Sequence, residues 1–532
     1  MLTRTLRPIT EASFDHHFAR HLPGESGPSR QARQVLNACW SDAPPTPVAA
    51  PRLLGWSCDL AAKLGLADPE DPEAVAAILA GNRLLPGMRP IAACYGGHQF
   101  GQWAGQLGDG RAIVLGDLLA PDGLRHEIQL KGAGLTPYSR HADGRAVLRS
   151  SLREFICSEA MHHLGIPTTR ALALVGTGET VLRDMFYDGH PQAEPGAIVT
   201  RVAPSFLRFG NFEIFAARDD IERLRLLTDY TLREHFPELG PPGRDAYIAL
   251  FEEVCRRTAL LMAHWLRVGF VHGVMNTDNL SILGLTIDYG PFGWLDSFDP
   301  DFTPNTSDRG GRYAWNQQPG IAQWNLMRLG DALYPLIGEV APIEKGLDIY
   351  ADTFAKSWSA MSLAKIGLPE GESAEDDSVL IRRLFSLLRE SEVDPTLFFR
   401  GLMAIDPDAL PPDRLPTALH DSFYAPEQLS GRWTDQLHQW LRDYAGTLGQ
   451  RGVTRESRLE RMGSANPVII PRNYLLQEVI VQAESGNIGG IDALLAAVRN
   501  PYTPRPALLP FTGRRPEWAR RSPGCSALSC SS

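Results

Sequence analysis

The chain has 532 residues, of which 43% are hydrophobic and 21% charged, and its formal net charge is −10. This apolar content suffices for a sizeable core, and the composition excludes disordered, collagen-like and disulfide-dense small proteins. An acidic chain argues against a nucleic-acid partner, which usually requires a basic surface. No stretch approaches the ~20 apolar residues of a membrane span, so we expect no membrane partner either.

The first 90 residues form a predicted N-terminal extension of helices and loops. Residues 1–22 contain no apolar run and no small-residue cleavage site, so we expect no secretory signal. A helix is predicted at residues 71–80, because Asp71 is a favourable N-cap and Pro72 suits the first helical position.

The sequence pattern of residues 91–215 predicts a β-rich lobe. A turn signal at Pro121 separates the first two strands, and residues 145–164 carry the apolar stripe of a helix. We therefore expect a small mixed sheet with one long helix. The predicted strands are residues 111–119, 126–130, 171–175, 180–183 and 197–202.

Residues 216–500 are predicted to form an α-rich lobe, and residues 501–532 a flexible C-terminal tail with little periodicity. The expected elements are amphipathic helices at residues 220–236 and 244–268, a polar loop at 272–279, a strand at 280–287, and further helices from residue 324 to about 500.

A Gly-rich segment, residues 101–111, leads into the first predicted strand. Its glycines, among them Gly108 and Gly110, allow a backbone to approach a phosphate closely, and Arg111 follows them. The spacing is neither that of a P-loop nor that of a Rossmann fingerprint. A simple hairpin turn is the alternative interpretation.

Lys131 lies at the end of a predicted strand. Alternation along that strand places Gln129 and Lys131 on one face and Ile128 and Leu130 on the other. A lysine there can bind a phosphate as a compact charge, and Glu154 on the predicted helix can pair with it and position it. The alternative is a solvated lysine and a solvated helix carboxylate.

The polar loop and the residues after it carry oxygen ligands. Asn279 follows His272 by seven residues, and Asp288 opens a D-Y-G triplet nine residues after Asn279. Oxygens of Asn and Asp suit Mg²⁺, which takes its other ligands from water and nucleotide phosphates. Asp278 can orient or deprotonate a hydroxyl group. The alternative is a turn rich in Asx residues.

The order of these motifs resembles the protein-kinase signature set: a Gly-rich loop, a strand Lys paired with a helix Glu, an H-x-x-x-x-x-x-N loop and a D-F-G triplet. One position departs from it, because Val274 stands where a kinase keeps its catalytic Asp. A conventional kinase with Val there should be severely impaired, and Asp278 is the obvious substitute.

Three long segments resemble the selenoprotein O family of pseudokinases, and the match spans roughly residues 85–530. They are YGGHQFGQWAGQLGDGRA, QLKGAGLTPYSRHADGRAVLRSSLREF and HGVMNTDNLSILGLTIDYGPFGWLD. The resemblance implies a two-lobed, protein-kinase-like α+β fold with N- and C-terminal helical extensions. It also implies that ATP binds in a flipped orientation and that AMP, not phosphate, is transferred to protein hydroxyls. Transfer of UMP from UTP is associated with bacterial members.

The same resemblance implies a role for each matching residue. Asp278 would be the proton acceptor, Asn279 and Asp288 would hold Mg²⁺ or Mn²⁺, and Glu154 would hold Lys131. The residues implied to bind the nucleotide are Gly108, Gly110, Arg111, Lys131, Asp143, Gly144, Arg201, Arg208 and Asp288.

The cysteines fall into two groups. Cys530 stands third from the C-terminus, where eukaryotic family members carry selenocysteine. Some bacterial members pair the tail Cys with one in an activation-like loop, but residues 297–312 contain no Cys here, so Cys525 becomes a candidate redox partner of Cys530. Two idle thiols are the alternative. Five scattered cysteines are expected to be small buried hydrophobes in a reduced, cytoplasmic protein: Cys39, Cys58, Cys94, Cys157 and Cys255.

We therefore expect a protein adenylyltransferase that uses ATP, or UTP, with a divalent metal and modifies proteins at Ser, Thr or Tyr hydroxyls. Two alternatives remain: an atypical phosphotransferase that uses Asp278, and a nucleotide-binding pseudokinase scaffold. The presence of Lys131, Asn279 and Asp288 argues against a silent scaffold. Label transfer from ATP labelled at the α or the γ phosphate distinguishes the three.

Overall fold

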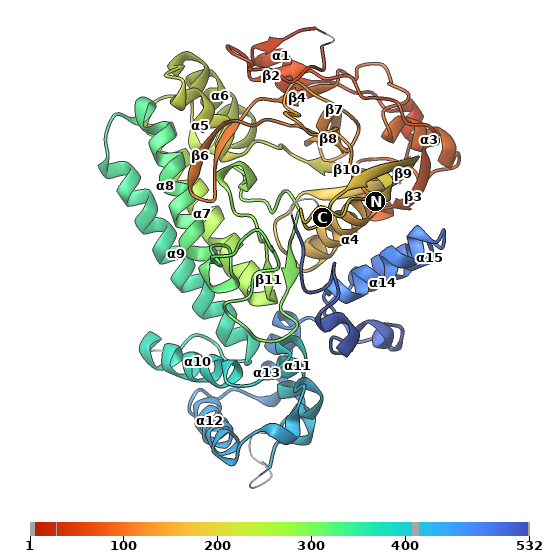
Figure 1. Cartoon of the computed structure of the whole chain (residues 1–532). Coiled ribbons are helices and arrows are strands. Elements are labelled where there is room, and N and C mark those ends of the chain that lie inside the picture. The colour runs from red at the N-terminus through yellow and green to blue at the C-terminus, as the bar shows by residue number, and fades with distance from the viewer. Residues whose placement is uncertain (1–5, 28, 372, 407–413, 530–532) are drawn as a thin grey trace.

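The molecule combines one large β-sheet with many helices (Figure 1). The computed structural model describes residues 6–27, 29–371, 373–406 and 414–529. In these ranges the main sheet has eight strands in the order β1-β2-β4-β7-β8-β10-β9-β3. The predicted α+β class is confirmed.

All eight strands come from the first part of the chain, and neighbouring strands pair antiparallel except β1 and β2. The two strands predicted at 171–175 and 180–183 are a single strand, β9. The bounds in the sheet are β1 (Gly24–Glu25), β2 (Trp40–Asp42), β3 (Arg52–Trp56), β4 (Ile91–Ala93), β7 (Ala112–Leu119), β8 (Arg125–Lys131), β9 (Arg170–Arg183) and β10 (Gln192–Ala203). Outside it lie a hairpin of β5 (Gly96–Gln99) and β6 (Gln102–Gln106), and the pair β11 (Phe270–Val271) and β12 (Gly293–Trp294).

The strand β8 lies inside the sheet between β7 and β10. Its Gln129 is paired with Arg201 of β10, and its Lys131 with Val199. Side chains alternate along a strand, and directly paired residues share a face. The register therefore brings Gln129, Lys131 and Arg201 to one face of the sheet, as the alternation in the sequence predicts for the first two.

The long helix α4 (Leu148–His163) confirms the helix predicted at 145–164. Its residues are almost all buried, because β9 and β10 contact it on one side and two C-terminal helices on the other. Those helices are α14 (Asn473–Glu484) and α15 (Gly489–Val498), which lie beside α4 in Figure 1. Burial on both sides holds Glu154 in a fixed place close to the sheet.

The first 90 residues contribute more than the predicted helices and loops. The strands β1 and β2 extend one edge of the sheet, and β3 forms the other edge. Each is only two to five residues long, so alternation could not reveal it. The predicted helix is confirmed as α3 (Pro72–Leu79), where the Ala74 N–H donates to the Asp71 carboxylate at 3.0 Å. Two short helices, α1 (His17–His21) and α2 (Cys58–Lys63), complete this part.

Helices make up most of the remainder. The helix α7 (Arg244–Val268) has the predicted bounds and ends at Gly269, whose left-handed φ of 74° suits a helix C-cap. In the described ranges no helix combines the length and apolar character needed to cross a bilayer. Beside α7 lie α6 (Ile221–His235), α8 (Gln318–Ile337) and α9 (Ala341–Lys365), and α5 (Phe209–Ala217) packs against α8.

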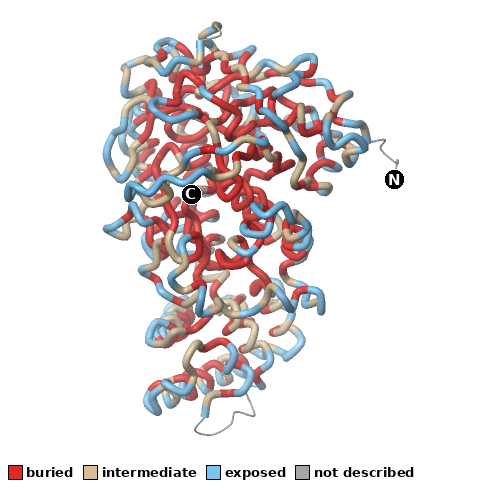
Figure 2. The backbone as a smooth tube through the Cα atoms, turned by 45° about the vertical axis from the view of Figure 1, so that its right-hand side comes forward, coloured by how far each residue is buried: buried red, intermediate tan, exposed pale blue. Residues whose placement is uncertain are grey.

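A second group of helices lies at the lower end of the molecule in Figure 1. It has its own hydrophobic core, separate from the large core shared by the sheet and the central helices. Figure 2 shows buried backbone running through the upper part, with exposed backbone on the outer turns of the lower helices. The members are α10 (Ala374–Arg389), α11 (Pro395–Ala404), α12 (Gly431–Gln450) and α13 (Arg455–Ala465).

The prediction of a strand at residues 280–287 is wrong. This segment makes only isolated bridges, Ser281 with Arg208 and Thr286 with Thr168. Between them Gly284 turns the chain with a φ of 71°, so close to α7 that an added Cβ would lie 2.6 Å from the Cβ of Arg257. The apolar residues that suggested a strand are buried by turns instead.

Within the predicted flexible tail, residues 501–529 contact distant segments at several points, although many of them are exposed. Residues 530–532, with Cys530, lie outside the described part. The Leu528 side chain is fully buried. Its N–H donates to the Pro304 carbonyl at 2.9 Å, and its carbonyl accepts from the Thr306 N–H at 2.8 Å. Arg520 pairs with Glu392 at 2.6 Å. These partners lie far away in the sequence, so the absence of local periodicity did not reveal them.

Candidate active site

Three side chains from β8, α4 and β10 form the centre of the candidate site. Glu154 is 1% exposed, and its Oε2 accepts from Lys131 Nζ at 2.6 Å. Arg201 donates to both oxygens of Glu154, at 2.5 and 3.1 Å. The remaining Arg201 nitrogen donates to Gln129 Oε1 at 3.1 Å. The predicted Lys131–Glu154 pair is confirmed, and Arg201 is a second cation on the same carboxylate.

Asp288 continues this network. Arg201 donates to its Oδ1 at 3.0 Å and Arg208 to its Oδ2 at 2.5 Å. Burial acts to raise the pKa of Asp288, but the guanidinium groups of Arg208 and Arg201 outweigh it and hold the pKa far below the usual range. Asp288 has a φ of 56°, a left-handed conformation that Asp tolerates better than most residues. The carboxylate is therefore ionised and held between two arginines.

The two arginines are buried, not at the surface. Arg201 is 3% exposed and Arg208 2%. Arg208 lies over the ring of Tyr95, with 4.6 Å between Cζ and the ring centroid, and donates to the Asp278 carbonyl at 2.9 Å. Buried guanidinium groups need charged or polar partners, which the carboxylates and this carbonyl supply.

His272 has a structural role in the polar loop. Its Nε2 lies 2.8 Å from the Ile287 carbonyl, and its ring stacks on Trp265. Burial lowers the pKa of His272, which favours the neutral ring. The side chain thereby ties the loop to the residue before Asp288.

Asn279 turns its amide toward the loop. Its Nδ2 donates to the Val274 carbonyl at 3.0 Å. Among the described residues no donor contacts the Asn279 Oδ1, so this oxygen is available to a ligand. Val274, in the position of the kinase Asp, is a buried aliphatic side chain.

Asp278 has the features of a proton acceptor. It is 6% exposed, its Oδ2 accepts from Gln99 Nε2 at 3.1 Å, and its Oδ1 has no partner in the described part of the chain. Burial raises the pKa of Asp278 to about 7, against the smaller opposing effects of Gln99 and Arg208. A pKa near neutrality suits a general base.

The β5–β6 hairpin covers this loop and supplies residues that the sequence analysis did not single out. Besides the Gln99 contact, the His98 N–H donates to Thr277 Oγ1 at 2.7 Å and the Phe100 N–H to Asn276 Oδ1 at 3.2 Å. A Cβ on Gly97 would lie 2.7 Å from Asp278 Oδ1, so only glycine fits there. The sequence feature that could have indicated these residues is the GGHQ run, residues 96–99, in the first motif segment.

The Gly-rich segment, residues 101–111, contains the second strand of this hairpin, β6, and a loop into β7. In the loop, a Cβ on Gly108 would lie 2.4 Å from the ring of Tyr138, and Gly108 has a φ of 84°. Gly110 is similarly close to the Tyr138 carbonyl, at 3.0 Å from its added Cβ. Both glycines therefore have a packing role, whether or not they also contact a nucleotide.

Arg111 follows the loop and is half buried, and no ion pair or side-chain hydrogen bond holds its guanidinium among the described residues. Burial lowers its pKa, and the neighbouring cations Arg201 and Arg183 act in the same direction. Its surroundings are thus already cationic.

Asp143 and Gly144 lie outside the central network, on the loop before α4. Asp143 pairs with Arg183 through both oxygens, at 2.7 and 2.8 Å. Gly144 has a φ of 71°, and its added Cβ would lie 2.2 Å from the Gly134 backbone. Burial acts to raise the pKa of Asp143, but its hydrogen bonds to Arg183 and to the Arg145 N–H outweigh this and lower the pKa, and the charge of Arg111 acts in the same lowering direction, so Asp143 lies within electrostatic reach of Arg111.

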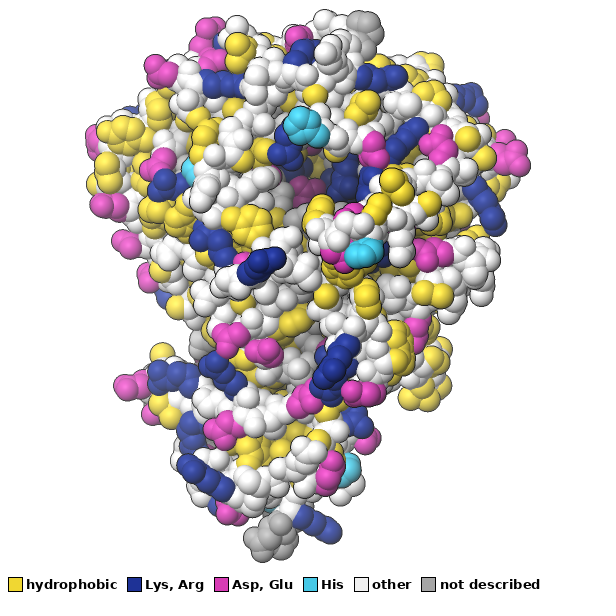
Figure 3. Space-filling model, viewed as in Figure 1, with side chains coloured by type: hydrophobic (Ala, Val, Ile, Leu, Met, Phe, Trp, Pro, Cys, Tyr) yellow, Lys and Arg dark blue, Asp and Glu magenta, His cyan; other side chains and the backbone are white. Residues whose placement is uncertain are grey.

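A hollow opens between the β5–β6 hairpin and β10. In Figure 3 this hollow is lined by dark-blue cationic side chains and has a carboxylate at its floor. In the described part of the chain no cluster of three or more His, Cys, Asp or Glu could hold a metal by itself. Asn279 keeps a free amide oxygen, and Asp288 is ionised with each of its oxygens paired to an arginine. Oxygens of these two types suit Mg²⁺, which takes its other ligands from water and phosphates.

Comparison with known proteins decides the family. The family model described as "Protein adenylyltransferase SelO" matches residues 30–499. The chain belongs to the SelO family of protein adenylyltransferases. Proteins named protein nucleotidyltransferase YdiU from Nitrosospira multiformis, Aromatoleum aromaticum and Azoarcus sp. are each 54% identical to it. The alignments cover 98–99% of this chain and 98–100% of those proteins.

This finding confirms the resemblance stated from the motif segments and the expected enzyme class, a protein nucleotidyltransferase of the SelO family. It leaves the roles of individual residues as predictions. The cysteine expectations are confirmed in part: Cys39, Cys94, Cys157 and Cys255 are buried free thiols, whereas Cys58 is half buried. Cys525 is also a buried free thiol, and its pairing with Cys530 stays a prediction.

Proposed function

We propose that this protein transfers AMP from ATP to Ser, Thr or Tyr hydroxyls of other proteins and releases pyrophosphate. Membership of the SelO adenylyltransferase family supports ATP as the co-substrate and protein as the acceptor. Since the relatives are named nucleotidyltransferases, UTP is the alternative donor.

One observation carries the proposal: more cationic side chains gather at the site than carboxylates that are held ionised there. Lys131, Arg201, Arg208 and Arg111 gather around two carboxylates held ionised, Glu154 and Asp288. Buried charges are normally paired, so the excess fits a polyphosphate. Planar guanidinium groups suit phosphate oxygens, and the same groups can stabilise the charge that develops on the leaving pyrophosphate.

Asp278 is the proposed proton acceptor. Its carboxylate takes the proton from the attacking hydroxyl, while Gln99 and Arg208 hold the residue through Oδ2 and the main-chain carbonyl. The hydroxyl oxygen then bonds to the α-phosphorus of ATP as the bond to the pyrophosphate oxygen breaks. The nearby aliphatic Val274 provides no base for conventional phosphoryl transfer.

Asn279 and Asp288 would hold the divalent metal, Mg²⁺ or Mn²⁺. A bound ion there supplies charge stabilisation to the phosphates. The chain's own contribution is a free amide oxygen on Asn279 and a carboxylate whose pKa is kept low by two arginines. Gly108, Gly110, Asp143 and Gly144 are proposed to border the nucleotide from the loops next to Arg111.

We further infer a two-lobed, kinase-like arrangement, with residues 91–215 as the N-lobe, 216–500 as the C-lobe, and extensions at both ends. The supporting features are the sheet with its central lysine strand, the helix that carries Glu154, and the mainly helical second half. A cytoplasmic location remains a prediction from cysteine usage.

Label transfer tests the function. Purified protein is incubated with a protein acceptor and ATP labelled at the α or the γ phosphate, and UTP labelled at the α phosphate is tested in parallel. We expect α label on protein from the wild type and none from Asp278→Ala, with ATP binding retained by calorimetry. Transfer of γ label, or full α transfer by Asp278→Ala, contradicts the proposal.

A further inference from the structure

The outer side of the β5–β6 hairpin exposes large aromatic side chains. Phe100 is 41% exposed and Trp103 40%. Gln99 of β5 points toward Asp278, so alternation along the strand turns His98 to the opposite face, which it shares with its cross-strand partner Trp103. The hairpin therefore has one face on the polar loop and another that is open to other molecules.

The open face continues from the hairpin to α8, which lies beside it in Figure 1. The centroid of the His98 ring lies 5.2 Å from that of Trp103 and 5.5 Å from that of Trp324 on α8. The Arg312 guanidinium lies over Trp324, with 4.9 Å between Cζ and the ring centroid. Single exposed rings are ordinary, but contiguous exposed rings mark a surface that binds another molecule.

Tyr313 connects this surface with the polar loop. Its ring centroid lies 5.2 Å from that of Phe100 and 5.8 Å from the Arg312 Cζ. Its hydroxyl donates to Asn276 Oδ1 at 2.6 Å, and the same oxygen accepts from the Phe100 N–H. Asn276 lies two residues before Asp278, so the surface begins beside the proposed proton acceptor. We call this surface the hairpin patch; its members are His98, Phe100, Trp103, Arg312 and Trp324.

Arg312 gives the hairpin patch a positive charge without a counter-ion. The side chain is half buried, it forms no ion pair in the described part of the chain, and its Nε is buried without a hydrogen bond. Arg328, which also lies near the Trp324 ring, is paired with Asp331 at 3.0 Å. Because the whole chain has a net charge of −10, attraction of an acidic partner has to come from a local cation such as Arg312.

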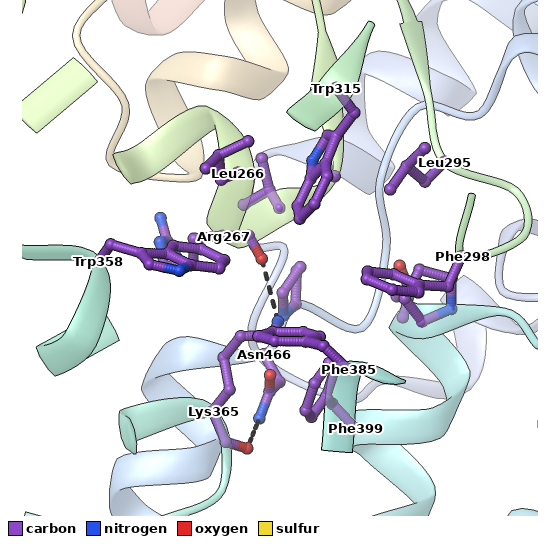
Figure 4. A pocket seen from close by; sticks show the side chains of 15 residues that line it. Leu266, Arg267, Leu295, Phe298, Trp315, Trp358, Lys365, Phe385, Phe399 and Asn466 are labelled. Carbon is purple, nitrogen blue, oxygen red and sulfur yellow. Dashed lines mark hydrogen bonds between the residues drawn. The ribbon is translucent and has the colours of Figure 1, made fainter. Parts of the chain in front are cut away.

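A second aromatic cluster, between α7, α9, α10 and α11, is closed to a protein partner. Its rings, among them Phe298, Trp315 and Trp358, surround about 30 Å³ of space, enough for one or two water molecules (Figure 4). A side chain of another protein does not fit there. The hairpin patch, in contrast, has exposed rings at the surface and lies beside Asp278.

We propose that the hairpin patch binds the acceptor protein, through a segment with an acidic and an apolar side chain close to the hydroxyl that is modified. This inference rests on the proposed function, because it names the class of acceptor. The acidic side chain pairs with Arg312, and the apolar side chain packs on Phe100 and Trp103. Aromatic residues and Arg are enriched at protein interfaces, and complementary charge gives such interfaces their specificity.

The test uses three synthetic peptides that differ only in charge. Each has a central Tyr, flanked on both sides by one Leu and then by two residues that are all Glu, all Gln or all Lys. Fluorescence anisotropy measures their binding to the full chain in the presence of α,β-methylene-ATP, an analogue that occupies the nucleotide site and cannot release pyrophosphate. We expect the Glu peptide to bind about five-fold more tightly than the Gln peptide, and the Lys peptide to bind most weakly.

Two variants separate the charge from the apolar contact. Arg312→Gln should remove the preference for the Glu peptide over the Gln peptide. Trp103→Ser should weaken the binding of all three peptides about ten-fold and keep the preference. Arg432→Gln, at an exposed position of α12 in the lower group of helices, is the matched control and should bind the peptides as the wild type does.

The proposal is overturned if the Glu peptide binds no better than the Gln peptide, or if Arg312→Gln keeps the preference. Should Arg312→Gln fail to fold, Trp103→Ser decides, because Trp103 is exposed, and unchanged peptide affinity in that variant overturns the proposal. A dimer in sedimentation that Trp103→Ser dissociates also overturns it, because a second copy then covers the hairpin patch.

Transfer of α label from ATP to the same peptides tests the proposed function separately. Charge-dependent binding without any transfer contradicts the proposed function and leaves the docking surface in place. Transfer without charge-dependent binding contradicts the docking surface alone.

Discussion

Replacing Glu154 with Gln tests the central network most directly. Among the described residues, Glu154 is the carboxylate that both Lys131 and Arg201 contact, and it is 1% exposed. The substitution keeps the shape of the side chain but removes its charge. Two buried cations then lose their common partner, while Asp288 remains on the far side of Arg201.

The expected cost follows from that geometry. Breaking a buried ion pair by removing one partner typically costs about 3–5 kcal/mol, because the other charge stays buried and uncompensated. We therefore expect Glu154→Gln to lower the free energy of unfolding by about this amount in urea denaturation. Activity should fall as well, since Lys131 and Arg201 are no longer positioned.

ATP should reverse part of the loss if the phosphates bind these cations. The free energy of unfolding of the wild type rises by about 2.7 kcal/mol when ATP is present at 100 times its Kd. In Glu154→Gln the phosphates no longer compete with a carboxylate, so we expect ATP to bind about ten-fold more tightly. At the same ATP concentration, ATP should then raise the free energy of unfolding of the variant by about 1.4 kcal/mol more than that of the wild type.

Glu159→Gln is the matched control. Glu159 lies on the same helix, is equally buried, and pairs with Arg170 at 2.6 and 2.9 Å, outside the proposed nucleotide site. The Glu159→Gln variant should lose a similar amount of its free energy of unfolding, and ATP should stabilise it no more than it stabilises the wild type. The reasoning is refuted if ATP raises the free energy of unfolding equally in the two variants. It is also refuted if the free energy of unfolding of Glu154→Gln lies within about 1 kcal/mol of the wild-type value.

Three further results are expected. Burial acts to raise the pKa of Glu154, but Arg201 and Lys131 outweigh it and lower the pKa below its ordinary value of 4.5. The stability that the ionised carboxylate provides is therefore complete above pH 4.5 and is lost as the pH falls below that value. In acid titrations followed by circular dichroism, the stability difference between wild type and Glu154→Gln should therefore shrink below pH 4.5, and a constant difference contradicts the pairing. Asp288→Ala should abolish transfer of the α label from ATP, and Asn279→Ala should reduce it less, because water can replace one neutral oxygen; near wild-type activity of Asp288→Ala removes the metal assignment. Val274→Asp places an unpaired charge at a buried position, so it should cost a few kcal/mol in urea denaturation and produce no transfer of γ label; a gain of γ transfer would show a kinase disabled at that residue alone.

Local signals in the sequence determined much of the fold. The Asp71 cap predicts α3, the amphipathic pattern before Gly269 predicts α7, and alternation along β8 places Gln129 and Lys131 on one face. These features depend on backbone preferences and on spacing within one element, so they can be read without knowledge of the rest of the molecule. The motif order likewise pointed to the Lys131–Glu154 pair and to the family.

Only the tertiary structure decided how the functional groups are connected. Arg201 meets Glu154 and Asp288 across 47 and 87 residues of chain, and Gln99 meets Asp278 across 179. The short edge strands, the contacts of the tail and the turn at Gly284 also depend on distant partners. The near-neutral pKa of Asp278 arises chiefly from burial, to which a hairpin far away in the sequence contributes. Desolvation and ion pairing depend on which segments surround a group in space, and no residue spacing within one segment specifies that.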